Sequence, residues 1–232
     1  MTNDKHKIIC AIDTGNKAEA ISMVKRLAPY CGAFKIGHGL TLPNGLGVID
    51  ELQDAGADRI FLDLKFHDIP NSVAVAVREA ARKGVWMLTL HLSGGPAMIT
   101  AAAEEAKLFG AVRRPLLVGV SVLTSLSEHH LHEHLGVNRS LHDQIVSLSQ
   151  LGVECGLDGV VCSVHEAKSV REVVGRAVIV TPGIRAHDAE RQDQSRVGDG
   201  QDALEAGADY LVVGRALTAH PDPEEALAAL RL

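Results

Sequence analysis

Short segments rich in Val, Ile and Leu alternate with segments of helical periodicity along most of this 232-residue chain. The strand-like segments are residues 7–13, 33–37, 59–65, 86–92, 115–122, 159–163, 177–182 and 210–215. Segments with apolar residues at helical spacing occur at 17–28, 71–83, 95–109, 140–154 and 223–232. This alternation predicts parallel strands joined by crossover helices. Eight units in this length favour an α/β fold of the closed (β/α)8, or TIM-barrel, type over an open doubly wound sheet.

A weak internal repeat supports the same strand and helix unit. The sequences LQDAGADRIFLDLK (52–65) and ALEAGADYLVVGR (203–215) each end a helix, turn at a glycine and enter a strand. Gly56 and Gly207 suit this turn because the residue after a helix commonly adopts a left-handed conformation. No Pro/Ser-rich linker interrupts the series, so we expect residues 1–232 to form a single barrel domain.

Composition and charge narrow the range of partners. The chain has 23 Lys and Arg against 29 Asp and Glu and no basic block, so we expect no nucleic-acid partner. No apolar segment approaches bilayer length, and MTNDKHKIICAID at the start lacks the apolar core of a leader, so we expect a cytoplasmic protein without a membrane partner. The cysteines are far apart in sequence and form no CxxC pair, which favours free buried thiols: Cys10, Cys31, Cys155 and Cys162.

Polar residues stand at the carboxyl ends of the strand-like segments. They are Asp13, Lys35, Asp63, Lys65, His91, Thr124, Ser163, the Thr181 and Pro182 turn, and the Gly214 and Arg215 pair. In a (β/α)8 barrel, this rim is where active sites are built. Ser163 precedes the helix-like segment 164–170, so we expect it to be a helix cap. Caps alone do not account for the lysines and aspartates at the rim.

The stretch FLDLKFHDIPN (61–71) leads from an apolar strand directly into ionisable groups. Because side chains alternate across a strand, Asp63 and Lys65 point to the same side. Lys35 lies on the preceding strand and Asp68 follows in the loop, so two lysines and two aspartates can form one cluster. Opposite charges favour the ionised forms against burial, so the cluster can hold an ammonium ready to donate a proton. The alternative is a buried ion-pair network that only stabilises the barrel.

The seventh and eighth strand-like segments end in TPGIR and VGR. The loops after these two strands are the usual phosphate site of a (β/α)8 barrel. Gly183 and Gly214 let backbone N–H groups approach an anion, while Arg185 and Arg215 supply guanidinium groups suited to phosphate. Taken singly, each arginine could be a surface residue and each glycine a turn residue, but their joint position favours a phosphate site.

A long polar loop, GIRAHDAERQDQSRVGDG (183–200), follows the seventh strand-like segment. It is either a disordered connector or a lid that closes over the barrel mouth when substrate binds. On the second interpretation, Gln194 is the candidate lid contact to phosphate.

Together these motifs resemble the orotidine 5'-phosphate decarboxylase family. The stretch FLDLKFHDIPNSV (61–73) is similar to that family's DxKxxDIPxT/S signature. Six further motifs follow the family's order, namely the AID of Asp13, the FKIG of Lys35, the VLTS of Thr124, the TPGIR of Arg185, the DQ of Gln194 and the VGR of Arg215. The resemblance extends from Ile9 to about Arg215.

The resemblance implies a role for each matching residue. Asp13 would hold ribose hydroxyls, Lys35 would contact the ribose and join the charged cluster, and Asp63 would lie beside the departing carboxylate. Lys65 would donate the proton, and Thr124 would contact the pyrimidine ring. The remaining substrate-binding residues, mostly for the phosphate, would be Pro182, Arg185, Gln194, Gly214 and Arg215.

The resemblance also implies a homodimer. Asp68, with Ile69 and Ser72 nearby, would reach across to the partner subunit's site. Each active site would then be shared between two copies of the chain.

The implied reaction converts orotidine 5'-monophosphate to UMP and CO2 in de novo pyrimidine biosynthesis, with no metal and no organic cofactor. Loss of CO2 leaves a carbanion at C6 with no adjacent electron sink, so the charge must be stabilised where it develops. Lys65 can stabilise that charge and then protonate C6. Asp63 would add repulsion against the substrate carboxylate, and binding of the distant phosphate would drive lid closure.

Two segments depart from the family pattern. Leu92 stands where the family usually has a small residue, and SRVGDGQDALEAGAD (195–209) replaces the more common RxxTPxxAxxxGAD. We expect Leu92 to reshape the pocket near His91, and segment 195–209 to alter lid closure. Neither departure removes a proposed catalytic group.

Two other functions stay open. A magnesium-dependent enzyme similar to 3-keto-L-gulonate 6-phosphate decarboxylase would share the DxKxxD signature, but Lys35 stands where that branch is expected to carry an acidic metal-binding residue. A non-catalytic barrel that binds nucleotide phosphates is the second alternative, against which the intact Asp63 and Lys65 argue.

Four histidines in EHHLHEHLG could suggest a metal site: His129, His130, His132 and His134. No carboxylate or cysteine framework with ligand spacing accompanies them. We therefore expect a solvated loop or a short helix after the fifth strand, and no metal site.

Overall fold

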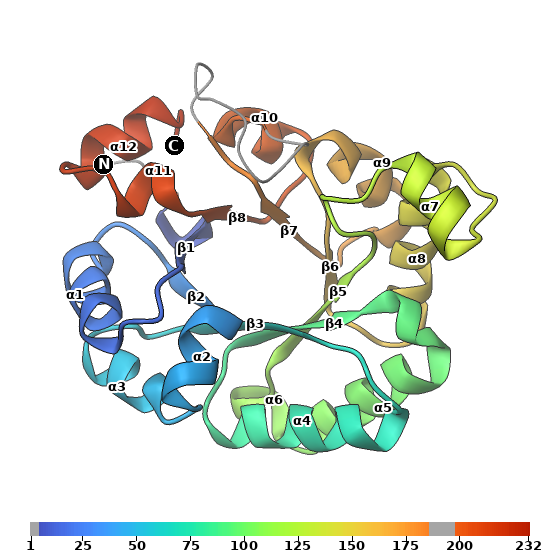
Figure 1. Ribbon diagram of the computed structural model, residues 1–232, viewed down its shortest axis with the longest axis horizontal. Helices are drawn as coiled ribbons and strands as arrows, with labels where there is room; N and C mark the ends of the chain where they lie inside the picture. Colours follow the sequence, from blue (N-terminus) through green and yellow to red (C-terminus); the bar gives the residue numbers. More distant parts are fainter. Residues whose placement is uncertain (1–4, 186–197) are drawn as a thin grey trace.

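The computed structural model describes residues 5–185 and 198–232, in which eight parallel strands close into a barrel in sequence order. Figure 1 shows the ring of strands enclosed by helices. The strands are β1 (Ile8–Ile12), β2 (Ala33–Gly37), β3 (Ile60–Phe66), β4 (Met87–His91), β5 (Leu116–Val120), β6 (Gly159–Val161), β7 (Val178–Pro182) and β8 (Tyr210–Val213). Each strand-like segment of the sequence supplies one of them. The predicted (β/α)8 fold is confirmed.

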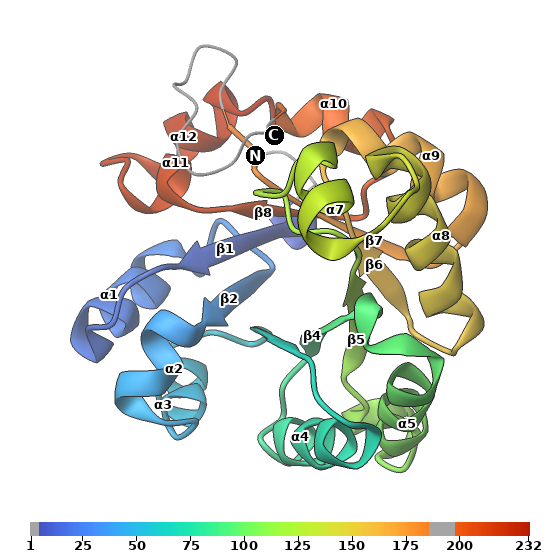
Figure 2. The ribbon, with the colours of Figure 1, turned by 45° about the vertical axis from the view of Figure 1, so that its right-hand side comes forward.

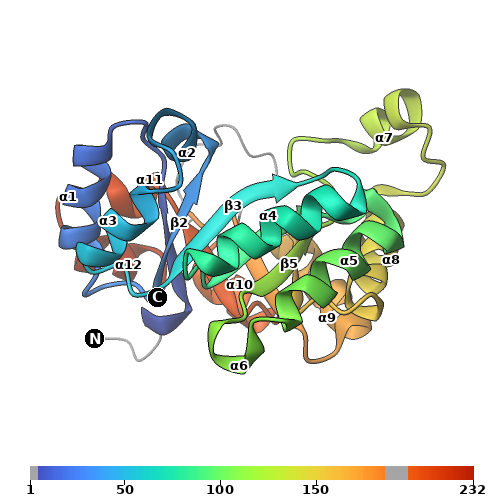
Figure 3. The same cartoon turned by 90° about the horizontal axis from the view of Figure 1, so that it is seen from below.

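The helices cover the outside of the barrel. Periodicity predicted α1 (Lys17–Leu27), α4 (Pro70–Arg82), α5 (Gly95–Lys107), α8 (Leu141–Glu154) and α12 (Pro223–Ala229). The others are α2 (His38–Asn44), α3 (Val48–Asp54), α6 (Gly110–Arg113), α7 (Glu128–Leu135), α9 (Val164–Val174), α10 (Gly200–Glu205) and α11 (Arg215–Thr218), with 3-10 turns η1 (Lys5–Lys7) and η2 (Leu92–Gly94). Helices α4 and α5 lie side by side on the outside of the barrel (Figure 2), and α7 projects from it (Figure 3).

Local sequence signals fix where several helices begin and end. The Asn16 side chain accepts hydrogen bonds from the first-turn amides of α1 and so caps it. Ser163 begins α9 as expected, and its N–H donates to the Glu166 carboxylate at 3.0 Å. Gly56 and Gly207, at the repeated turn, have positive φ angles of 110° and 103°. The expectation that glycine suits these two turns is therefore confirmed.

Both faces of the barrel strands are buried. Alternate residues form an inner apolar layer, made of Ile9, Ala11, Ala33, Phe61, Met87, Val118, Val180 and Val212. The residues between them pack outward against the helices. Lys35, Asp63 and Thr89 each follow an inner-layer residue by two positions, so the strand period directs all three into the barrel, just above the apolar layer.

The described ranges 5–185 and 198–232 contain no helix that is long and apolar enough to cross a membrane. The four cysteines, all within these ranges, are free, as predicted, but only Cys10, Cys31 and Cys162 are buried, whereas Cys155 is partly exposed. Cys10 and Cys31 are close in space although they are distant in sequence. A hydrogen bond with the Cys31 side chain, together with burial, raises the pKa of Cys10 well above its ordinary value.

Candidate active site

A cavity of about 700 Å³ lies at the carboxyl ends of the barrel strands. Its lining includes most of the residues that the sequence singled out: Asp13, Lys35, Asp63, Lys65, Thr124, Pro182, Gly183, Arg185, Gly214 and Arg215. The strand order of the barrel thus brings together side chains that are up to 202 positions apart in the sequence, from position 13 to position 215.

Asp63 is the centre of a compact charged cluster. Lys35 Nζ lies 3.1 Å from Asp63 Oδ2, and Lys65 Nζ lies 3.0 Å from both oxygens of the same carboxylate. The Asp63 side chain is 12% exposed, against 17% for Lys35 and 34% for Lys65. The two ammonium groups therefore share one largely buried carboxylate and leave a net positive charge at the cavity wall.

The two lysines keep Asp63 ionised despite its burial. Burial by itself would raise the pKa of the carboxyl group, but the charges of Lys35 and Lys65 and their hydrogen bonds outweigh it, and the pKa lies below its ordinary value. The carboxylate is thus a permanent negative charge in the cavity at neutral pH, and it holds both ammonium groups in position.

Lys65 reaches this cluster through an irregular piece of strand. Its φ angle is +50°, an unusual value for a residue with a side chain. Beside it, β3 advances four residues, from Leu62 to Phe66, while β4 advances only two, from Leu88 to Leu90. The alternation of side chains along a strand correctly predicted that Lys65 points to the same side as Asp63. It did not predict this bulge.

Thr89 on β4 is a site residue that sequence reasoning missed. Its hydroxyl donates to Asp63 Oδ1 at 2.9 Å and accepts from the backbone N–H of Lys65 at 2.8 Å. The side chain is only 1% exposed. The available signal was a polar residue at an inward position of an otherwise apolar strand, since a buried hydroxyl needs partners.

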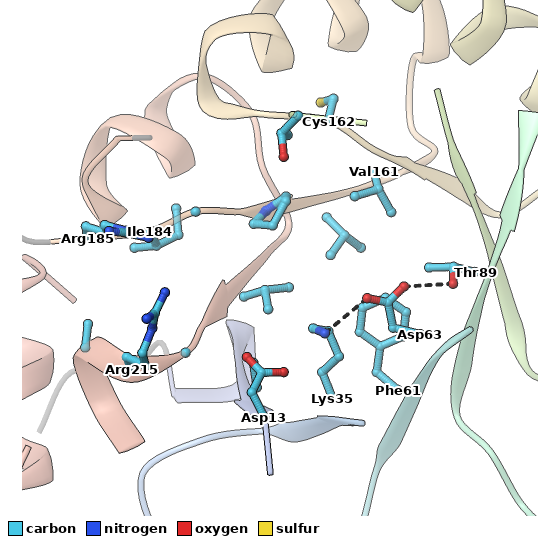
Figure 4. Close-up of a pocket in the computed structure, with 18 of the residues that line it drawn as sticks. Asp13, Lys35, Phe61, Asp63, Thr89, Val161, Cys162, Ile184, Arg185 and Arg215 are labelled. Atoms are coloured by element: carbon cyan, nitrogen blue, oxygen red, sulfur yellow. Dashed lines mark hydrogen bonds and ion pairs between the residues drawn. The ribbon is translucent and has the colours of Figure 1, made fainter. Parts of the chain in front are cut away.

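The opposite end of the cavity carries two arginines. Figure 4 shows Arg185 and Arg215 on the far side from Asp63, with Asp13 and Lys35 between them. Gly183 has a φ angle of +81°, which lets β7 turn sharply before Arg185. Arg215 opens α11 directly after β8. The cavity thus has two arginines at one end and the cluster of two lysines and one aspartate at the other.

Comparison with known proteins assigns this barrel to a family. Residues 6–230 match the family described as Orotidine 5'-phosphate decarboxylase / HUMPS. The chain belongs to the orotidine 5'-phosphate decarboxylase / HUMPS family. It is 44% identical to the orotidine 5'-phosphate decarboxylase of Moorella thermoacetica, over 97% of this chain and 91% of that protein. It is 43% identical to that of Pseudoalteromonas translucida, over 96% of this chain and 94% of that protein.

Solved structures agree with this membership. The orotidine 5'-phosphate decarboxylase from Lactobacillus acidophilus superposes with a TM-score of 0.83 at 32% identity, covering 97% of this chain and 96% of that chain. An uncharacterized conserved protein from Geobacillus kaustophilus gives a TM-score of 0.82 at 33% identity, covering 97% and 98%. The family resemblance read from the motifs is confirmed.

Three described residues that the family resemblance singled out are not part of this cavity. Asp68 and Ile69 are exposed in the loop before α4, where Asp68 Oδ1 accepts from the Ile69 N–H at 2.6 Å. Ser72 is partly exposed in the first turn of α4. Within one subunit, Asp68 thus stands apart from the cluster of two lysines and Asp63. Gln194 lies outside the described residues.

Leu92 does not shape the cavity, contrary to expectation. It is fully buried in η2 and packs on the helix side of the barrel against Gly119 and Gly152. The chain turns directly after His91, so adjacent residues face different environments. In this family member, a large residue at position 92 is accommodated by glycines that leave room for it.

The segment after the loop is anchored at its described end. Asp199 accepts from the Asp202 N–H at 2.8 Å, which caps α10, and from Arg231 Nη1 at 2.7 Å. Burial would raise the pKa of Asp199, but these hydrogen bonds outweigh it and the pKa is lowered. Asp199, which lies in the segment that departs from the family pattern, thus links this segment to Arg231 near the end of the chain. Its effect on lid closure stays a prediction.

Two histidines lie near the charged cluster. The rings of His67 and His91 are 5.2 Å apart between centroids. Burial lowers the pKa of His91, and the neighbouring His67 and Lys65 lower it further. The neutral form of His91 is therefore favoured at neutral pH, which fits a packing or hydrogen-bonding role.

The histidine-rich sequence forms the short exposed helix α7, as expected. The Ser127 N–H donates to His130 Nδ1 at 3.1 Å, which caps the helix start. Across residues 5–185 and 198–232, no group of three or more His, Cys, Asp or Glu side chains is arranged to hold a metal ion.

Proposed function

We propose that this protein converts orotidine 5'-monophosphate to UMP and CO2, with Lys65 as the proton donor and without a metal or organic cofactor. The observation that carries the proposal is the Lys35, Asp63 and Lys65 cluster, in which both Nζ atoms lie within 3.1 Å of one buried carboxylate. Membership of a family whose relatives are named orotidine 5'-phosphate decarboxylase supports the choice of substrate.

The chemistry follows from where charge develops. The bond between C6 and the carboxylate breaks, CO2 leaves, and the electron pair stays on C6. The Lys65 ammonium stabilises this pair and transfers a proton from Nζ to C6. Asp63 beside the departing carboxylate adds repulsion that is relieved as CO2 forms. Lys35 keeps Asp63 ionised while Lys65 moves toward C6.

The rest of the cavity would orient the nucleotide. Asp13 and Lys35, which lie between the two ends in Figure 4, would bind the ribose. Thr124 would contact the pyrimidine ring beside Pro182. The phosphate would be held at the other end by Arg185, Gln194, Gly214 and Arg215. Binding there would supply energy for closing the loop between β7 and α10.

We further propose a homodimer in which Asp68 completes the partner's site, with Ile69 and Ser72 at the contact. Asp68 lies outside its own subunit's cavity, and Ile69 is 67% exposed although it is a large apolar residue. An exposed isoleucine beside an aspartate fits a surface that a second copy covers. Residues 1–232 would act as one catalytic domain, and the four free thiols fit a reducing compartment such as the cytoplasm.

A magnesium-dependent sugar-phosphate decarboxylase is the competing function. Lys35 disfavours it, because its ammonium occupies the space beside Asp63 that a metal ligand would need. A barrel that only binds nucleotide phosphates is disfavoured by the Lys65 ammonium beside Asp63 in the cavity, because phosphate binding alone does not require this pair.

One assay separates these functions. Purified protein is mixed with orotidine 5'-monophosphate, and its conversion to UMP is followed by ultraviolet absorbance, with and without EDTA. We expect turnover that EDTA leaves unchanged. No conversion would refute the decarboxylase, and activity abolished by EDTA would favour the metal-dependent alternative.

A further inference from the structure

The bulge in β3 gives the backbone of Lys65 an irregular conformation and removes the regular hydrogen-bond partner of its N–H. At its positive φ angle, a residue with a side chain is strained. The shift of register between Leu62 and Phe66 also takes the Lys65 N–H out of the regular ladder with β4. This partly buried N–H needs another acceptor, and it donates to the hydroxyl of Thr89 at 2.8 Å.

The same hydroxyl has a second partner. Since its oxygen accepts from Lys65, its single hydrogen is free to be donated, and it points to Asp63 Oδ1 at 2.9 Å. Figure 4 shows this contact on the side of Asp63 opposite to Lys35. One buried oxygen atom thus connects the backbone of the proposed proton donor with the carboxylate that holds its ammonium.

We propose that Thr89 is a positioning residue, whose hydroxyl fixes the relative placement of Lys65 and Asp63 for the reaction. Only the expected effect on turnover rests on the proposed function. The inner layer of the barrel is apolar two positions before it, at Met87, and opposite it, at Val118. A hydroxyl at this place therefore has no packing advantage over a valine side chain, and its two hydrogen bonds explain it.

Several charged or titratable groups surround Asp63, and the Thr89 hydroxyl differs from them because it is neutral. Lys35 approaches from β2 and Lys65 from β3 itself, and His91 faces the cluster from β4. Asp13, after β1, lines the same cavity. The two ammonium groups fix the charge of the carboxylate, whereas the Thr89 hydroxyl is a neutral donor to it, so its removal tests position without changing the number of charges.

The test compares Thr89→Val, which keeps the shape and removes the hydroxyl, with Thr89→Ser, which keeps the hydroxyl and removes a methyl group. With orotidine 5'-monophosphate, we expect kcat of T89V to fall about 10- to 100-fold, since small misplacements of reacting groups cost this much. KM should change little, because the phosphate contacts lie at the other end. T89S should retain most of the turnover. If packing were the role of Thr89, T89S would be the more impaired variant.

A second readout does not depend on turnover. The pKa of Asp63 is measured in the ligand-free protein by NMR titration of ¹³C-labelled aspartate carboxyls, with Asp63→Asn to assign the signal. Loss of a hydrogen bond to the ionised form raises a carboxyl pKa, so we expect a higher pKa in T89V than in the wild type and T89S. If the wild type shows no turnover, the proposed function fails and this titration alone decides the role of Thr89.

Thr181 provides a matched control. It is fully buried on β7, and within residues 5–185 and 198–232 its hydroxyl has no hydrogen-bond partner. It belongs to the outward-facing set of β7, between Val180 and Pro182, so Thr181→Val should leave both kcat and the Asp63 pKa as in the wild type. An unchanged kcat and Asp63 pKa in T89V, or equal losses in T89V and T89S, would overturn the proposal.

Discussion

At the scale of single residues, Lys65 is the proposed proton donor and therefore the first target for substitution. Lys65→Ala should lower turnover of orotidine 5'-monophosphate by at least about 10²- to 10⁴-fold, the range that a general acid contributes. Lys65→Arg should lose a similar factor, since a guanidinium retains its proton. Turnover is measured by ultraviolet absorbance, and circular dichroism checks that the variants fold.

Lys83→Ala is the matched control for these substitutions. Its ammonium pairs with Asp50 at 2.7 Å outside the cavity, so its loss should leave turnover unchanged. Wild-type turnover in Lys65→Ala would contradict the assignment of Lys65 as the proton donor.

Asp63 should make stability depend on pH in the acid range. Its pKa in the folded protein lies below its ordinary value, so folding favours the ionised form. The resulting stabilisation is fully present above the unfolded pKa of roughly 3.9, and it is lost as pH falls through the lower folded pKa. We expect the melting temperature of Asp63→Asn to lie below that of the wild type at pH 6, and the difference to shrink below about pH 4. A difference that is constant between pH 6 and pH 3 would show that the lysines do not favour ionised Asp63.

At the scale of elements, Leu92 and two glycines form a matched packing unit. A methyl group on Gly119 would lie 2.7 Å from Leu92 Cγ, and one on Gly152 would lie 2.7 Å from Leu92 Cδ2. Gly119→Ala should therefore destabilise the protein by about 1–3 kcal/mol through overpacking. Leu92→Ala should cost about 2–5 kcal/mol through the cavity it leaves.

The double variant tests whether the two effects share one space. Since the new methyl group would fill part of the cavity, Leu92→Ala with Gly119→Ala should be more stable than the sum of the single effects by about 0.5–3 kcal/mol. Urea unfolding measures all three variants. Leu42→Ala, at a side chain that is 79% exposed, should change stability by less than about 0.5 kcal/mol. Strict additivity would contradict the packing unit.

The sequence predicted the elements better than their irregularities. The strands were found because apolar runs and helical periodicity alternate, which are properties of consecutive residues. The bulge beside Lys65 arises from how β3 pairs with β4, so no pattern within either strand reveals it. Thr89 was missed for the same reason, since its partners Asp63 and Lys65 lie on another strand. Leu92 was misplaced because it directly follows the polar strand end His91, while η2 turns its side chain to the helix side of the barrel.

At the scale of the whole molecule, closure of the barrel brings motifs that are far apart along the chain together into one site. The polar strand ends were expected at one rim. The cavity lining from Asp13 to Arg215 confirms that most of them meet, but His91, Ser163 and Thr181 do not line the cavity. The distances within the cluster could not be predicted, because they depend on strand tilt and register around the whole ring. Residues that would act in a second subunit also need an assembly, which no single chain contains.

If each active site is shared between two subunits, as proposed, variants of Asp63 and Asp68 should complement each other in a mixed dimer. Asp63→Asn should inactivate the subunit's own site, and Asp68→Ala the partner's site. In a mixed dimer of the two variants, one site combines both substitutions, and the other has wild-type Asp63 and wild-type Asp68. Mixing equal amounts and allowing exchange should thus restore about a quarter of wild-type turnover, since half of the dimers are mixed and each has one intact site.

The control for subunit exchange is a mixture of two preparations of Asp63→Asn, one with an affinity tag, which should form tagged and untagged dimers yet regain no activity. The same tag shows exchange in the mixture of Asp63→Asn with Asp68→Ala. If exchange is complete and activity stays at the level of the single variants, Asp68 serves its own subunit or none. In that case the exposed Asp68 and Ile69 need another explanation, because neither lines the cavity of the chain to which it belongs.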